Sequence, residues 1–588
     1  MIPEDTIILF ENFSFRYKAQ SAPTLHNINL KVSRGEKILI LGPSGSGKST
    51  LIHCINGIIP HAYSGESSGS LVLNGSDINS LDIFGISKIA GTVLQDTDGQ
   101  FVGLSAAEDI AFAMENDCVE ISEMRERVSK AASLVDMSFH LTKSPQDLSG
   151  GQKQRISLAG VLVDNVDLLL FDEPLANLDP AAGREAINLI DELQKKSGKT
   201  ILIIEHRLED VLHCPVDRIV VMDHGRIIAD KSPGELLELN ILKEIGIREP
   251  LYLSALKYAG IKINAEMMPE NVNTLKIDNQ ILFKWDNHLA LKEKEFRMTN
   301  KKPEINNEKE NGLVVEDIYF KYEKDGVEAL KWVSFSVAPG ECVGLVGRNG
   351  SGKSTMAKCI CGFIKPDSGT IYYNDDNLEK LSIMERAEKI GYVMQNPNQM
   401  ISFPMIYDET AFGLRNRAVP EKEEKERVFE ALNVCGLYPF RNWPVNALSY
   451  GQKKRLTIAS IVVLRPHFII LDEPTAGQDY RHYTEFMEFL LRLKEDLGLS
   501  LLLITHDMHL MLEYTVRAVV LSEGACIADK EPSLVLTDNI IIENASLKPT
   551  SLYTLALNAG LKDPRGFVKR YISHERQTHK INNGENNK

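Results

Sequence analysis

Short apolar runs alternate with amphipathic stretches along this chain. The runs are continuous, as in strands buried on both faces of a parallel sheet, and lack the alternation of half-exposed strands. They read KILILG, DLLLFDE and TILIIEH in the first half and CVGLVG, FIILDE and LLLITH in the second. Residues 184–199, REAINLIDELQKKSGK, show helical spacing that ends at a glycine. Strands that alternate with helices predict an α/β fold with a mainly parallel sheet.

The same pattern occurs twice, so the chain is duplicated. GPSGSGKST at residues 42–50 matches GRNGSGKST at 347–355, and LSGGQKQR at 148–155 matches LSYGQKKR at 448–455. We place the two domains at residues 1–240 and 312–540. Residues 241–311 are expected to form a helical appendix and a charged linker that begins near Leu291, because that stretch is polar and poor in large apolar residues. Residues 541–588 are expected to form a C-terminal helical appendix with a frayed polar tail.

Net charge and hydropathy limit the kinds of partner that the chain is expected to bind. The net charge is −15, which makes the chain a poor candidate for binding nucleic acid through clustered cations. No apolar run approaches the roughly 18 to 20 residues that cross a bilayer, so we expect no direct membrane span and any membrane role to depend on a partner.

Two phosphate-binding loops are the clearest chemical signal. Residues 42–49 and 347–354 fit GxxxxGK[ST], and each follows an apolar strand and precedes a helical segment. In such loops backbone N–H groups surround the phosphates, the lysine reaches the terminal phosphates, and the following serine can ligate Mg²⁺. The predicted nucleotide-binding residues are Gly42, Pro43, Ser44, Gly45, Ser46, Gly47, Lys48, Ser49, Thr50, Gly347, Arg348, Asn349, Gly350, Ser351, Gly352, Lys353, Ser354 and Thr355.

Paired carboxylates end two of the predicted strands. Asp172 and Asp472 are expected at the carboxyl edge of the sheet beside the phosphate loops, where they could hold Mg²⁺ together with Ser49 and Ser354. The next residues, Glu173 and Glu473, could orient or deprotonate a water that attacks the γ-phosphate.

The motif LSGGQ upstream of an apolar strand and DEP resembles the signature of ATP-binding cassette (ABC) ATPases, and the likeness spans both halves. It implies two tandem ABC ATPase domains, each with a phosphate-loop core, an antiparallel β part and a helical subdomain. It also implies ATP and Mg²⁺ as cofactors. By this resemblance, Tyr17 and Tyr322 stack on adenine, Gln95 and Gln395 are the Q-loop glutamines, Ser149, Gly150, Gly151, Ser449 and Gly451 belong to the signatures, Asp179 and Asp479 to the D-loops, and His206 and His506 are the switch histidines.

The resemblance further implies that the two domains pair within the chain, so that each ATP is clamped between one phosphate loop and the other domain's signature. Both halves keep a glutamate, and we therefore expect two competent sites. The second signature departs from the pattern, because Tyr450 stands where the first has Gly150. We expect a modest effect if that residue has ordinary helical geometry.

The segments that follow Gln95 and Gln395 resemble those of energy-coupling factor (ECF) transporter ATPases, in which a further glutamine, here Gln100 or Gln399, begins a helix that contacts the transmembrane T component. This implies an ATPase at the cytoplasmic face of the cell membrane. It would energise import of a vitamin, vitamin precursor or transition-metal ion, together with a T component and a substrate-binding membrane component. One alternative is the fused ATPase of a conventional importer for sugars or peptides. Another is a soluble ABC protein of translation or DNA repair, for which we would expect a basic linker, a zinc motif or a long heptad insertion.

Overall fold

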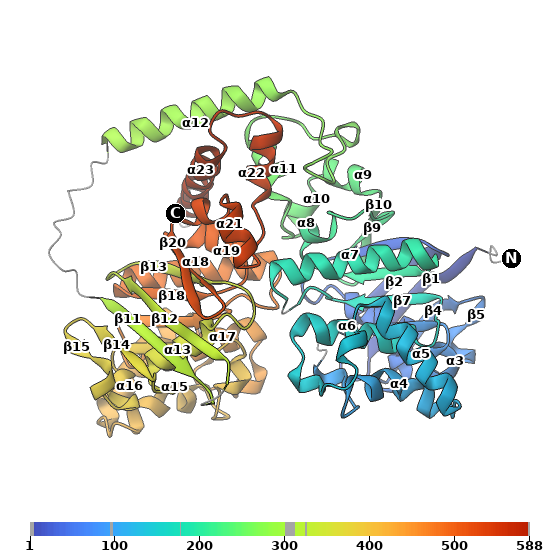
Figure 1. The fold of residues 1–588 in the computed structure, drawn as a ribbon, viewed down its shortest axis with the longest axis horizontal. Coiled ribbons are helices and arrows are strands. Elements are labelled where there is room, and N and C mark those ends of the chain that lie inside the picture. The colour runs from blue at the N-terminus through green and yellow to red at the C-terminus, as the bar shows by residue number, and fades with distance from the viewer. Residues whose placement is uncertain (1–4, 95–97, 177, 300–311, 324–325, 586–588) are drawn as a thin grey trace. The chain divides into compact units, whose positions relative to one another are not determined.

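The computed structural model describes residues 5–94, 98–176, 178–299, 312–323 and 326–585. The chain divides into two compact units (Figure 1). Unit 1 comprises Met1–Ile281 with Gly477–Arg481, and unit 2 comprises Leu282–Ala476 with His482–Lys588. Each unit is built around one mainly parallel sheet and one antiparallel sheet.

The central sheet of unit 1 has the order β10-β9-β3-β8-β7-β6. All neighbouring strands are parallel except β9 and β10. The carboxyl ends of β3, β7 and β8 therefore meet at one edge, which is where the chain carries its phosphate loop, Asp172 and His206. The strands are β3 (Lys37–Leu41), β6 (Ala90–Val93), β7 (Leu168–Asp172), β8 (Thr200–Ile204), β9 (Arg218–Asp223) and β10 (Arg226–Lys231).

An antiparallel sheet with the order β2-β1-β4-β5 covers this core. Its apolar side chains, such as Phe10, Phe15 and Leu30, share one buried cluster with Ile38 of β3 and Leu51 of the following helix. The strands are β1 (Thr6–Tyr17), β2 (Leu25–Ser33), β4 (Gly65–Leu73) and β5 (Ser76–Asp77).

The helical subdomain of unit 1 lies between β6 and β7 in the chain. The helix after β7 shows how local sequence sets its bounds, since Asp179 caps its N-terminus, Pro180 follows, and Gly198 ends it with φ 65°. The helices are α1 (Lys48–Ile55), α2 (Ile58–His61), α3 (Ile83–Ser87), α4 (Ala106–Asn116), α5 (Ile121–Leu134), α6 (Gly150–Leu162), α7 (Pro180–Ser197), α8 (Leu208–Val211), α9 (Pro233–Glu238), α10 (Ile241–Glu244) and α11 (Leu251–Tyr258), with 3-10 turns η1 (Ile78–Ser80), η2 (Asp98–Gln100), η3 (Ser138–His140), η4 (Pro145–Asp147) and η5 (Ala265–Met267).

Unit 2 repeats this architecture, with sheets ordered β16-β17-β18-β13-β19-β20 and β12-β11-β14-β15. Its strands are β11 (Leu313–Lys321), β12 (Glu328–Val337), β13 (Cys342–Val346), β14 (Ser368–Tyr373), β15 (Asp376–Asn377), β16 (Ile390–Val393), β17 (Phe468–Asp472), β18 (Ser500–Ile504), β19 (Arg517–Ser522) and β20 (Ala525–Lys530). Its helices are α12 (Asn279–Thr299), α13 (Lys353–Cys361), α14 (Ile383–Arg386), α15 (Ile406–Arg415), α16 (Glu421–Val434), α17 (Tyr450–Val462), α18 (Tyr480–Leu497), α19 (Met508–Tyr514), α20 (Pro532–Val535), α21 (Asn539–Asn544), α22 (Ser551–Asn558) and α23 (Pro564–Glu585), with 3-10 turns η6 (Leu378–Lys380), η7 (Pro397–Gln399), η8 (Tyr438–Phe440) and η9 (Val445–Ala447).

The stretch expected to be a linker is helical as far as Thr299, because α12 continues through it. The ring of Trp285 lies 5.9 Å from that of Phe567 and 6.1 Å from that of Tyr571, both on α23. Arg570 of the same helix donates to Asp286 at 2.7 Å. Polar residues such as Lys and Glu are good helix formers, so a polar helix docked by one face resembles a linker in sequence. Residues 300–311 lie outside the described part of the chain.

The tail expected to fray is also helical, since α23 runs to Glu585. Arg576 donates to the carbonyls of Leu512 and Thr515 at 2.9 and 3.1 Å, which anchors this helix within the stretch that was expected to fray. Within the described ranges, no helix has both the length and the apolar character needed to cross a membrane.

Candidate functional site

Both phosphate loops hold their lysine in the same way. Lys48 Nζ donates to the carbonyls of Gly42 and Pro43 at 2.8 and 2.9 Å, and Lys353 Nζ donates to the matching carbonyls of its own loop, both at 2.8 Å. Both lysines are buried. Burial lowers the pKa of Lys48, and the nearby charge of Glu173 opposes this change. Each ammonium is therefore fixed within the curl of its loop, where it can meet phosphate oxygens.

Close packing explains the first glycine of each loop. A Cβ on Gly42 would lie 2.4 Å from the carbonyl oxygen of Met222, and one on Gly347 would lie 2.1 Å from that of Leu521. Deeper in the loops, the hydroxyls of Ser46 and Ser351 are buried without a hydrogen-bond partner in the described structure. A buried hydroxyl without a partner is costly, so these groups fit a bound phosphate that accepts from them.

Burial raises the pKa of the predicted magnesium-binding aspartate in both units. In unit 2, Asp472 Oδ2 accepts from Ser354 Oγ at 3.2 Å and from Tyr392 Oη at 2.9 Å. In unit 1, burial raises the pKa of Asp172 to about 6, with the charge of Glu173 adding to the effect. A carboxylate beside a serine hydroxyl is an oxygen donor set that suits Mg²⁺. Tyr392 was not predicted from the sequence. It belongs to no motif, and only the packing of the sheet brings its hydroxyl to Asp472.

The predicted bases occupy unusual backbone geometry. Glu173 has φ 50° and Glu473 has φ 46°, both in the left-handed region that residues other than glycine rarely adopt. Such strain is concentrated at functional sites. In unit 1, Glu173 Oε1 lies 2.5 Å from His206 Nε2. Burial favours a higher pKa for Glu173, but the hydrogen bond and charge of His206 outweigh it and lower the pKa.

The equivalent pair in unit 2 is joined through different atoms. Glu473 Oε1 lies 2.7 Å from His506 Nδ1 and accepts from the backbone N–H of His506 at 3.1 Å. Thr505 Oγ1 donates to Glu473 Oε2 at 3.4 Å. In each unit the structure therefore joins the predicted base to the predicted switch histidine.

The signature serines begin helices. Ser149 caps α6 and Ser449 caps α17, each in a capping box with the glutamine three residues later. Tyr450 is the first residue of α17, and its φ is not positive. A Cβ on Gly150 would meet only an ordinary contact of 3.7 Å, so this position has room for a side chain. This geometry agrees with the expectation of a modest effect.

The remaining predicted residues lie around the two loops. Tyr17 and Tyr322 each have their hydroxyl 3.1 Å from the threonine hydroxyl that follows the phosphate loop, Thr50 or Thr355. Gln395 is exposed after β16. Gln95 lies outside the described residues. The other predicted loop and signature residues are Ser44, Gly45, Gly47, Asn349, Gly350, Gly352, Gly151 and Gly451, with Asp179 and Asp479 directly before α7 and α18.

The glutamines expected to begin a helix do not do so. Gln100 ends η2 and Gln399 ends η7, whereas the next helices, α4 and α15, begin only at residues 106 and 406. Gln100 Oε1 accepts from the backbone N–H of Leu94 at 3.3 Å, and in unit 2 Met400 Sδ takes the matching place. The counterpart of Gln100 is therefore Met400 and not Gln399, because the two segments align residue by residue.

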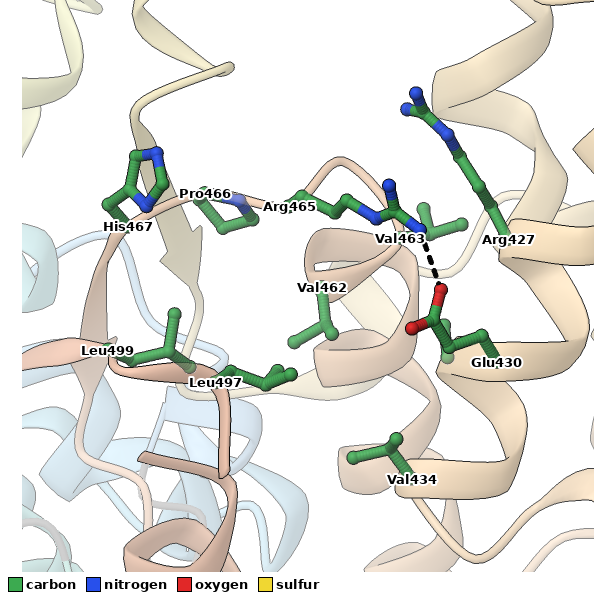
Figure 2. A pocket seen from close by; sticks show the side chains of 11 residues that line it. Arg427, Glu430, Val434, Val462, Val463, Arg465, Pro466, His467, Leu497 and Leu499 are labelled. Atoms are coloured by element: carbon green, nitrogen blue, oxygen red, sulfur yellow. Dashed lines mark hydrogen bonds and ion pairs between the residues drawn. The ribbon is translucent and has the colours of Figure 1, made fainter. Parts of the chain in front are cut away.

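A pocket in unit 2 lies away from this chemistry (Figure 2). It borders the start of β17, with His467 directly before that strand, whereas Asp472 ends it. Its lining combines apolar side chains with the ion pair of Arg465 and Glu430 at 2.8 Å. Five strand residues separate it from the phosphate edge by about 15 Å, so this pocket is not the predicted nucleotide site.

Comparison with known proteins supports the reading of these motifs. The family model described as ABC transporter matches residues 25–176 and 330–476. An ABC transporter ATP-binding protein of Clostridium perfringens is 55% identical over 572 residues, which cover 97% of this chain and 98% of that protein. The chain belongs to this family. It is an ATP-binding subunit of an ABC transporter, and its ABC domains hydrolyse ATP.

Further relatives extend over the same length. ABC transporter ATP-binding proteins of Enterococcus faecalis and Vibrio parahaemolyticus are 52% and 50% identical, over 97% and 99% of this chain and 99% and 98% of theirs. Residues 239–320 match a family described as ATP-binding cassette cobalt transporter. The solved structure of CbiO1 from Clostridium perfringens, part of the ABC transporter complex CbiONQ, is 34% identical and covers 40% of this chain and 94% of its own, with a TM-score of 0.37.

These matches confirm the predicted tandem ABC ATPase fold and ATP hydrolysis by an ABC transporter subunit. The alternative of a soluble ABC protein of translation or DNA repair is wrong.

Proposed function

We propose that this chain is the ATPase subunit of an ECF-type importer of a vitamin, a vitamin precursor or a transition-metal ion. The observation that carries the proposal is the match of residues 239–320 to the family described as ATP-binding cassette cobalt transporter, because this region lies outside the residues that match the general ABC transporter model. The segments after the Q-loop glutamines add to it. An ATPase subunit does not contact the transported substrate, so the choice within this class rests with its partners.

In the proposed mechanism, the phosphate loops bind ATP and the chain's own residues prepare its hydrolysis. Lys48 and Lys353 place positive charge at the terminal phosphates, and the N-termini of α1 and α13 add their partial charge. Mg²⁺, held by Ser49 and Asp172 or by Ser354 and Asp472, would neutralise charge on the β- and γ-phosphates.

Each glutamate then acts on water. Glu173 and Glu473 accept the proton of the attacking water, while His206 and His506 hold these carboxylates in place. Tyr17 and Tyr322 stack on adenine through their rings. The pairing of each phosphate loop with the other domain's signature stays a prediction.

The proposed partners are a transmembrane T component and a substrate-binding membrane component, with this chain at the cytoplasmic face of the membrane. Exposed apolar side chains of unit 1 support a protein partner. Val102, Leu104 and Phe139 are 63%, 86% and 95% exposed, and the first two lie between η2 and α4. Exposed apolar side chains in one segment mark interaction sites. We propose that this segment contacts the T component.

Purification of the chain from its native membranes tests the proposal. We expect mass spectrometry to identify one T-type transmembrane protein and one small substrate-binding membrane protein. Recovery of two permeases with an external binding protein would support a conventional importer instead. Leu104→Asp should reduce recovery of the T component at least tenfold, whereas Val327→Asp, which alters an equally exposed residue between β11 and β12, should not.

A further inference from the structure

The residue before each switch histidine differs between the two units, and the sequence motifs do not account for the difference. Glu205 precedes His206 at the end of β8, and Thr505 precedes His506 at the end of β18. Glu205 is 3% exposed. Burial raises its pKa, and the charge of Arg207 opposes this. Because burying a carboxyl group is costly, its presence here needs a specific reason.

Glu205 accepts hydrogen bonds from the backbone of the switch segment. Its Oε2 accepts from the N–H of His206 at 2.6 Å and from that of Arg207 at 3.4 Å. Arg207 Nε lies 3.9 Å from Oε1. The carboxyl group therefore engages the same backbone N–H that presents the switch histidine.

In unit 2 the equivalent N–H has a different acceptor. The N–H of His506 donates to Glu473 itself at 3.1 Å, and Thr505 Oγ1 also donates to Glu473. Thr505 in turn accepts from the N–H of Asp507 at 2.9 Å. The backbone N–H of the histidine therefore binds a separate acceptor in unit 1 and the predicted base in unit 2.

The imidazole contacts differ as well. Glu173 is joined to His206 through Nε2, whereas Glu473 is joined to His506 through Nδ1. In unit 1 the histidine meets the base with the nitrogen furthest from its backbone. In unit 2 the ring nitrogen nearest the backbone and the backbone N–H both meet the same carboxylate oxygen.

We infer that Glu205 is a positioning residue of the first ATPase domain: it binds the backbone N–H of His206 and so fixes the switch segment with the imidazole Nε2 against Glu173. A general base acts only when it is held within hydrogen-bond reach of the proton that it accepts. Glu205 thereby sets how His206 holds Glu173, and the two domains hold their glutamates through different nitrogens of the histidine. This inference rests on the proposed role of Glu173 as the base.

The test uses the assembled transporter complex with Glu205→Thr, which installs the residue of unit 2, and Glu205→Gln, whose amide oxygen still accepts from His206. The kcat of ATP hydrolysis should fall about tenfold in Glu205→Thr with KM for ATP unchanged, since the switch segment loses the acceptor that fixes His206 against Glu173. Glu205→Gln should stay within about twofold of the wild type. Both variants are also measured in the Glu473→Gln background, where Glu173 is the remaining base.

Three outcomes overturn the inference. Glu205→Thr with wild-type kcat excludes the positioning role. Equal losses in Glu205→Thr and Glu205→Gln assign the effect to charge and not to the acceptor, and a rise in KM without a change in kcat assigns it to nucleotide binding. If Glu205→Thr unfolds, Glu205→Ser, which is smaller and lacks the acceptor reach, replaces it with the same expected loss.

Glu173→Gln in the same complex separates this inference from the proposed mechanism. Full activity of Glu173→Gln would remove the base role and the inference with it. Loss of activity in Glu173→Gln beside an unaffected Glu205→Thr would leave the base role intact and overturn the inference alone.

Discussion

The carboxylate of Glu173 lies 2.5 Å from the imidazole of His206, although 33 residues separate them in the chain. They follow β7 and β8, which are neighbouring parallel strands. The parallel sheet therefore brings the predicted base and the predicted switch histidine to the same edge. The backbone of Glu173 is in the left-handed region, a strained conformation of the kind that is concentrated at functional sites.

Removing the base from either domain should impair hydrolysis. We expect Glu173→Gln and Glu473→Gln each to lower ATP turnover by about a hundredfold, because general-base catalysis contributes on this scale. Nucleotide binding should persist, since the phosphate loops are unaltered, and equilibrium ATP binding serves as the control. Normal turnover in Glu173→Gln with an inactive Glu473→Gln would instead show that the first domain does not turn over.

The phosphate-loop lysines should both be required. Lys48→Ala or Lys353→Ala removes the buried ammonium that the loop carbonyls hold, and with it the charge that meets the terminal phosphates. We expect each substitution to lower steady-state turnover at least tenfold, or about 1.4 kcal/mol of barrier. Full activity in either single variant would contradict a requirement for two competent sites.

Sequence predicted the parts of the site that depend on local chain geometry. The phosphate loops and the strand ends with Asp172 and Asp472 follow from patterns within a few residues. Such patterns reflect backbone requirements that each short segment meets by itself.

Contacts between distant segments could not be predicted in this way. Tyr392 reaches Asp472 across 80 residues, and α12 docks on α23 through Trp285. Local hydropathy indicates neither contact. The first depends on the single hydroxyl of Tyr392, and the second on a narrow apolar face of the otherwise polar helix α12. The expectation that Gln100 or Gln399 begins a helix was wrong for a related reason. The resemblance implied a role for these glutamines but gave no information about their local backbone.

The docking of α12 gives a stability prediction. Arg570 and Asp286 form a largely buried ion pair, with side chains 10% and 15% exposed. In Asp286→Ala the guanidinium of Arg570 keeps its ion pair with Asp563, which is partly exposed. We expect the free energy that holds α12 against α23 to fall by about 2 kcal/mol. Hydrogen exchange of the α12 amides should accelerate accordingly. Lys284→Ala, at an exposed position of the same helix, is the control, and equal acceleration in both variants would contradict the role of the pair.

The signature tyrosine should affect turnover only slightly. Tyr450 has ordinary helical backbone, and Ser449 still caps α17. Tyr450→Gly should therefore alter ATP turnover by less than about tenfold, or ~1.4 kcal/mol. Gly150→Tyr in unit 1 provides the matched reverse substitution, for which the structure offers space at the Cβ. A larger change in Tyr450→Gly would show that the ring takes part in the reaction.

Next to this tyrosine lies a buried lysine that should make stability depend on pH. Lys454 is 4% exposed, and its ammonium lies 5.2 Å from the Tyr450 ring and donates to the carbonyl of Pro474 at 2.7 Å. Burial lowers its pKa to about 8 from 10.5, and the charge of Glu473 opposes the shift. Unit 1 has Gln154 at the equivalent position, where it donates to the carbonyl of Pro174 at 2.5 Å.

The sign of the effect follows from proton binding. Below about pH 8 the lysine is charged in both states, so the folded state carries the full cost of burying the charge. Between pH 8 and 10.5 the folded state releases the proton first, and the stability of the wild type should rise with pH. Lys454→Gln removes the buried charge and keeps a donor for Pro474. We therefore expect it to stabilise the protein at pH 7 by up to about 3 kcal/mol and to flatten the rise of stability toward pH 10.

Urea unfolding followed by tryptophan fluorescence measures this effect. The three tryptophans of the chain, Trp285, Trp332 and Trp443, all belong to unit 2, so their fluorescence reports on the unit that contains Lys454. An unchanged pH dependence in Lys454→Gln would assign the effect to other groups, and Gln154→Lys, which alters unit 1, should leave the fluorescence transition unchanged.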